Sequence, residues 1–114
     1  MPYTDSATNG ITSSTGYRSA IGRFDGTKES YPGWRLQFEH HLKDHEPLLY
    51  NCIGGDEATV LASPGYAVNN GKLFSALICS LDTASAVLID SLAENNGREA
   101  LVALEREFVA QSLI

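Results

Sequence analysis

The chain of 114 residues is long enough for one folded domain. Its hydrophobic fraction of 43% is ordinary for a globular protein and excludes a wholly disordered chain. The formal net charge is -6, from 14 acidic and 8 basic residues, and the basic residues stand singly along the sequence. Because binding to nucleic-acid phosphates requires clustered Lys and Arg, the sequence predicts no direct nucleic-acid binding by this segment.

The two cysteines, Cys52 and Cys79, each stand in apolar sequence, which is typical of buried thiols. A disulfide framework or a zinc site would need more ligands at short spacing, so a reducing, intracellular setting is expected. No apolar stretch reaches the roughly eighteen residues of a membrane span, and the polar N-terminus lacks the pattern of a secretory signal.

Residues 1–23 are rich in Ser, Thr, Gly and Asn, a composition that buries too little apolar surface to offset the entropy of ordering. We therefore expect a flexible N-terminal arm, followed by a helical domain over residues 24–114. Ile11 and Ile21 are among the few apolar residues of the arm, and they would allow it to pack onto the body or onto a neighbour.

The first helix is expected from Tyr31 to His45. It follows a turn at residues 24–27, with Ser30 as a candidate N-cap and a proline in the first turn, where a missing N–H costs nothing. Its apolar stripe is Trp34, Phe38 and Leu42. Trp34 can anchor the core or contact a partner, and the helical spacing favours the core.

Two short helices come next. The apolar residues between 48 and 53 predict one that is closed by Gly54-Gly55, and Asp56 is expected to cap another that continues to Leu61. Residues 63–65, Ser-Pro-Gly, then turn the chain. Tyr66 follows in the same predicted loop and is the best candidate for an aromatic residue exposed at an interface.

Three longer helices are expected to complete the fold. One carries the apolar face of Leu73, Leu77 and Leu81, with Ile78 beside it, and the next, over residues 84–92, is so apolar that we expect it to be buried centrally. The last starts after Asn95-Asn96-Gly97 and has the stripe Leu101, Leu104 and Phe108. A second Asn-Asn-Gly triplet, at 69–71, is likewise interpreted as helix punctuation. The fold class is therefore all-α, a compact bundle of five or six helices.

No constellation of catalytic residues appears. His41 and His45 stand at i, i+4 and could share a helix face, but no third ligand follows at a fixed spacing, so a solvated face is favoured over a metal site. No isolated carboxylate pair, nucleophile elbow or phosphate-binding loop is present. The sequence predicts neither an enzyme nor a cofactor.

The order of these features resembles Gag proteins of copia-type LTR retrotransposons. Those begin their folded part with an aromatic-Asp/Asn-Gly-Thr/Ser turn and a Trp, as residues 24–34 do, and continue with an amphipathic helix, as residues 35–42 do. Residues 78–81 and 101–108 resemble two later helical motifs. The residues that carry the resemblance and the predicted core are Phe24, Gly26, Trp34, Phe38, Leu42, Ile78, Leu81, Leu101, Leu104 and Phe108.

Two departures qualify the resemblance. Leu101 stands where the family has a Trp in the last helix, and the chain has no zinc knuckle. In the family that knuckle, or a basic tail, lies downstream and binds RNA, so we expect this chain to be an N-terminal fragment of a longer polyprotein.

The resemblance implies a domain like the N-terminal domain of a retroviral capsid protein. Its role would be that of a structural subunit whose partner is another copy of itself, assembling into virus-like particles in the cytoplasm around RNA. The alternative is a monomeric Gag-derived adaptor that binds a peptide or protein partner in a groove between its helices. Neither interpretation involves a membrane.

Overall fold

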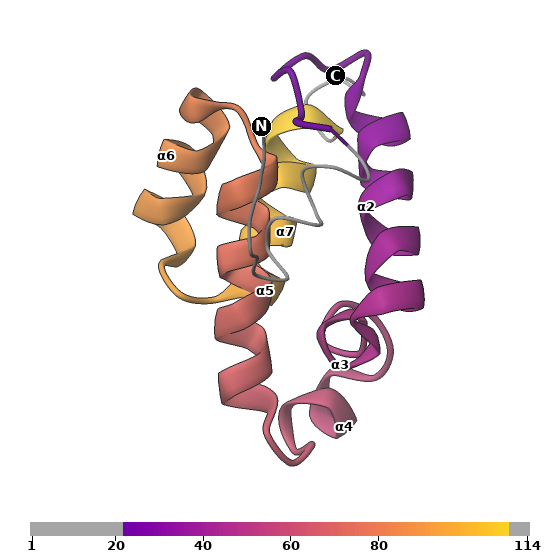
Figure 1. Ribbon diagram of the computed structural model, residues 1–114. Helices are drawn as coiled ribbons and strands as arrows, with labels where there is room; N and C mark the ends of the chain where they lie inside the picture. Colours follow the sequence, from indigo (N-terminus) through magenta and orange to yellow (C-terminus); the bar gives the residue numbers. More distant parts are fainter. Residues whose placement is uncertain (1–21, 110–114) are drawn as a thin grey trace, which may run out of the picture.

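The computed structural model describes residues 22–109, so the predicted arm of 1–23 falls almost wholly outside the described residues. Figure 1 shows the helices of the described range, which contains no strand. They are α2 (Tyr31–His45), α3 (Pro47–Tyr50), α4 (Glu57–Leu61), α5 (Tyr66–Ser80), α6 (Thr83–Ala93) and α7 (Gly97–Phe108). The predicted all-α bundle is confirmed. No helix in this range is both long enough and apolar enough to cross a membrane.

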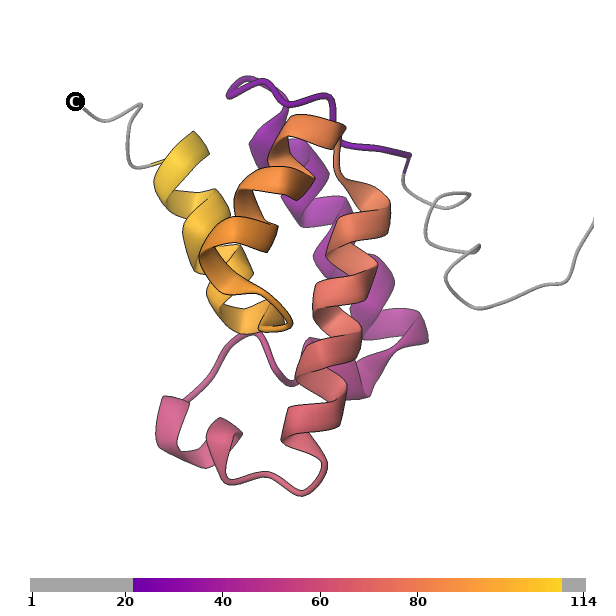
Figure 2. The ribbon, with the colours of Figure 1, turned by 90° about the vertical axis from the view of Figure 1, so that its left-hand side faces the viewer.

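The pair α5 and α7 forms the centre of the bundle. α6 packs on α7, α3 packs on both α2 and α5, and α5 packs on α7. The two views of the ribbon agree that α2 and α6 lie on opposite sides of this central pair (Figures 1 and 2). Both helices therefore have one face toward the core and one toward solvent.

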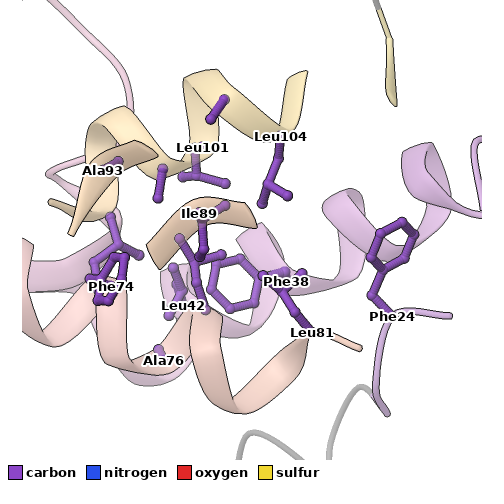
Figure 3. Close-up of a cluster of buried hydrophobic side chains, with 14 of the residues drawn as sticks. Phe24, Phe38, Leu42, Phe74, Ala76, Leu81, Ile89, Ala93, Leu101 and Leu104 are labelled. Carbon is purple, nitrogen blue, oxygen red and sulfur yellow. The ribbon is translucent and has the colours of Figure 1, made fainter. Parts of the chain in front are cut away.

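The core is continuous from the first turn to the last helix. Phe38 and Leu42 of α2, Ile89 of α6 and Leu101 and Leu104 of α7 gather in one buried cluster (Figure 3). All of the residues that carry the predicted core are buried except three, which are half-buried: Gly26, Ile78 and Phe108. Trp34 is buried as well, next to Phe38 at a ring separation of 5.1 Å.

The turn before α2 is fastened to the body through Phe24. The backbone N–H of Phe24 donates to the carbonyl of Ser80 at 2.9 Å, and the Phe24 ring packs edge-on against Phe108 at 5.0 Å. Gly26 has φ +84°, and a Cβ there would meet Asp82 at 3.0 Å, so only glycine suits both the conformation and the space.

Ser30 occupies the N-cap position of α2, as predicted, but its side chain caps nothing. Its hydroxyl donates instead to the carboxylate of Asp25, which also accepts from the backbone N–H of Thr27 at 2.9 Å. These hydrogen bonds, with that from Ser30 the largest, hold the pKa of Asp25 below its usual value.

The start of α5 differs from the prediction. The helix begins at Tyr66, directly after Gly65 at φ +76°, and runs through the triplet Asn69-Asn70-Gly71 without interruption. Asn residues often end helices because their side chains compete for the local backbone. Asn70 does not compete, because its side chain is buried and bonds to another helix.

The two Asn-Asn-Gly triplets meet in space. The amide of Asn70 donates to Asn96 Oδ1 at 2.8 Å, and its own oxygen accepts from the backbone N–H of Arg98, also at 2.8 Å. Asn96 accepts in turn from the N–H of Glu99 at 3.1 Å and caps α7, as predicted. The second triplet is therefore helix punctuation, whereas the first anchors the helix that the second begins.

The side chain of Arg98 extends this connection to α3. Its Nη1 donates to the carbonyls of Cys52 at 3.1 Å and Ile53 at 3.2 Å. These belong to the turn that follows α3, where the α-helix ends at Tyr50 rather than continuing to residue 53 as expected. Of the two predicted buried thiols, Cys52 is buried, whereas Cys79 is only half-buried.

The prediction that the apolar helix over 84–92 is central is wrong. α6 is an outer helix that buries only Ser85, Ile89 and Ala93, one residue per turn. Two of these are small, so α6 approaches α7 closely along a narrow stripe. Ala86 and Leu88 are half-buried, and Ala84, Val87 and Leu92 are exposed.

Candidate interaction surfaces

Several large apolar side chains remain exposed although the core is well filled. They are Leu36, Leu48, Leu61, Val68, Val87, Leu92 and Val102. Scattered exposed apolar residues are normal on a soluble protein. What distinguishes this set is that it places large exposed side chains on two helices that lie on opposite sides of the molecule (Figures 1 and 2): Leu36 on α2, and Val87 and Leu92 on α6.

The outer face of α6 consists of Ala84, Val87, Ser91 and Leu92, which are exposed, and Leu88, which is half-buried, and we call it the α6 face. Val87 lies opposite the buried stripe and is 63% exposed, and Leu92 is 64% exposed. Asp90 and Glu94 are also exposed and border this face. No Lys or Arg occurs anywhere between residues 73 and 97, so the charged side chains that α6 itself contributes beside this face are acidic.

The outer face of α2 consists of Gly33, Leu36, His40 and Lys43, which we call the α2 face. These residues recur at i, i+3, i+7 and i+10, opposite the buried stripe, and all are exposed. Leu36 at its centre is 60% exposed. Lys43 gives the face a positive charge, with Asp44 at its edge.

A groove lies where the chain leaves α3 and enters α4. It has a volume of about 500 Å³, and its lining includes Glu39, Tyr50, Ile53, Asp56 and Val60. Asp56 also caps α4, as predicted, by accepting from the backbone N–H of Thr59 at 3.0 Å. No side chain of α4 is buried, so one wall of the groove is only lightly fixed to the body.

Tyr66 does not lie in an exposed loop. It is the first residue of α5, half-buried, and packs against the core. Burial raises the pKa of its phenol, and nearby Cys52 adds to the shift. Its predicted role at an interface stays a prediction.

The histidines of α2 lie close to one another. The rings of His41 and His45 are 4.7 Å apart, and the pKa of His41 is lowered by burial and by the neighbouring His45. Over residues 22–109 no third His, Cys, Asp or Glu joins them in a group that could hold a metal ion. The described part of the chain therefore offers surfaces and a groove as its candidate sites.

Sequence reasoning missed the α2 and α6 faces. Leu36 lies off the apolar stripe that the sequence predicts for its helix, and Val87 and Leu92 belong to the apolar stretch that is predicted to be central. The available signal was the broad apolar arc on α6. Apolar surface on every side of a helix is normally covered, so a side that the core leaves open is a candidate for a partner. Only the packing reveals that one side of this helix has no neighbour.

Comparison of the chain with protein-family models, with curated proteins and with solved structures finds no match. The geometry of the chain itself is therefore the basis for a functional proposal.

Proposed function

We propose that the chain is a structural subunit that self-assembles, in the manner that its resemblance to Gag predicts, into the shell of a cytoplasmic virus-like particle. The observation that carries the proposal is the exposure of large apolar side chains on opposite sides of the bundle (Figures 1 and 2), Leu36 on α2 and Val87 and Leu92 on α6. A subunit with two different faces can bind one neighbour with each of them, and such heterologous contacts repeat into rings or tiled layers.

Charge is consistent with this role. A net charge of -6 disfavours contact with RNA, so a shell built from these domains leaves RNA capture to a separate basic region. A structural role also requires no catalytic chemistry. The work of such a domain is done by the shape and chemistry of its outer surfaces.

Sedimentation velocity of the 114-residue chain tests the proposal. Because lateral contacts in shells are individually weak, we expect the mean mass to rise between about 10 µM and 1 mM, with species larger than a dimer at the upper end. A chain that stays monomeric over this range, at low and at high salt, would contradict self-assembly.

A monomeric adaptor is the second candidate, and the groove beside α4 favours it. A volume of about 500 Å³ suits a few side chains of a bound peptide, and the acidic Glu39 and Asp56 in its lining favour a basic ligand. Replacing residues 56–63 with a short Gly-Ser linker should abolish binding of a basic, apolar peptide in an NMR titration while self-association persists. If self-association were lost instead, the segment would belong to the assembly surface.

A further inference from the structure

We propose that the α2 face of one copy docks on the α6 face of the next copy. This inference rests on the proposed self-assembly and names the contact that produces it. The occupant of each face is thus a second copy of the chain.

The placement of the two faces supports a head-to-tail contact. α2 and α6 lie on opposite sides of the α5 and α7 pair (Figures 1 and 2), so one subunit cannot bring its own two faces together. A symmetric dimer that paired α6 with α6 would leave both α2 faces exposed to water. Pairing unlike faces covers both kinds of face in every subunit of a growing assembly.

Charge complementarity selects the unlike pairing. Asp90 and Glu94 border the α6 face, where no Lys or Arg is near in sequence, whereas Lys43 lies on the α2 face. Two α6 faces would bring four carboxylates together, whereas Lys43 on the α2 face supplies a positive charge that α6 lacks. Docking α2 on α6 places opposite charges across the contact instead.

The shape of the faces suits two helices that cross closely. Leu36 and Val87 project from the centres of the two faces, and small residues flank them: Gly33 on α2, and Ala84 and Ser91 on α6. A Cβ at Gly33 would meet nothing within 4 Å in its own subunit. Gly33 stands in the first turn of α2, so the absence of a side chain there leaves one flank of Leu36 open to a close approach by a neighbouring helix.

Two single variants test the contact. Leu36→Asp blocks the α2 face and Val87→Asp blocks the α6 face, and both side chains are exposed enough for the fold to survive. Each variant alone should remain monomeric in sedimentation velocity at concentrations where the natural chain associates. A 1:1 mixture should form dimers and nothing larger, because the mixture contains one intact face of each kind.

The control is Val68→Asp, which places the same charge at a valine that is 64% exposed but lies on neither face. Circular dichroism should show native helix content for all three variants, and Val68→Asp should associate like the natural chain. Either of two results overturns the contact: a face variant that associates normally, or a mixture that stays monomeric.

Charge reversal provides an independent test. Lys43→Glu and Asp90→Lys should each weaken association about two- to fivefold, and the double variant should recover most of the loss. If the natural chain assembles but none of these variants alters it, the α2–α6 contact is wrong while self-assembly stands. If the natural chain never associates, the proposed function fails and the contact fails with it.

Discussion

At Gly97 the N-terminal end of α7 lies against α5 with no room for a side chain. A Cβ there would come within 2.5 Å of Leu73 Cγ and 2.8 Å of the Asn70 carbonyl oxygen. The same close approach allows Asn70 to reach the backbone N–H of Arg98. Residue size at this one position thus fixes how the two central helices meet.

Replacing Gly97 with alanine should therefore lower the free energy of unfolding by about 1 to 3 kcal/mol, because the added methyl forces the helices apart. Gly71 in α5 is the matched control, since a Cβ there meets nothing within 4 Å. Gly71→Ala should raise the stability by up to about 1 kcal/mol through helix propensity. Urea denaturation of both variants measures the contrast, and equal effects would show that the close approach is not tight.

At the scale of the helix, α6 behaves as an outer element despite its composition. Ile89→Ala should cost about 2 to 5 kcal/mol, because it empties a fully buried position. Val87→Ala should change the stability by less than about 0.5 kcal/mol, because that side chain already contacts water. Thermal and chemical denaturation of the two variants distinguish an outer helix from a central one, for which both changes would be costly.

The helices were largely predictable from local sequence, and their positions were not. The range of α2 and the caps Asp56 and Asn96 follow from short patterns, so the sequence was sufficient for them. Asn70 looked like a helix terminator because its hydrogen-bond partners lie more than twenty residues away. Neither the α2 face nor the α6 face could be predicted, because the exposure of a helix side depends on whether another helix packs against it.

Across the whole molecule, one polar cluster connects α2 to α7. The Tyr31 hydroxyl donates to Glu105 at 2.8 Å, Arg35 Nη1 lies 2.5 Å from the same carboxylate oxygen, and Arg35 Nε pairs with Glu39. Burial of Tyr31 raises the pKa of its phenol above the usual value. The fold therefore favours the neutral phenol, which serves as the hydrogen-bond donor.

This cluster makes stability fall in alkali. A tyrosine in the unfolded chain ionises near about pH 10, whereas the folded protein holds the Tyr31 proton to higher pH. The stabilisation is complete below about pH 10 and is lost as the pH rises above it. Tyr31→Phe should flatten this decline, although it lowers stability at neutral pH by removing the hydrogen bond to Glu105.

Chemical denaturation of the natural chain and of Tyr31→Phe, between about pH 8 and 11, gives the slope of the free energy of unfolding against pH for each protein. The decline that remains in the variant includes the contribution of Tyr66, whose pKa is also raised. Parallel curves would mean that the Tyr31 phenol is not held in its neutral form by the fold.

The lightly fixed segment between Gly55 and Gly65 has a consequence for how this protein can change. Because α4 buries no side chain, residues here can be added, removed or exchanged with little effect on the core. Related chains should differ most in length at this loop, and a foreign epitope inserted there should leave the rest of the bundle intact. If copies do assemble, each would then present the inserted peptide once, and the protein would become a scaffold for repetitive display.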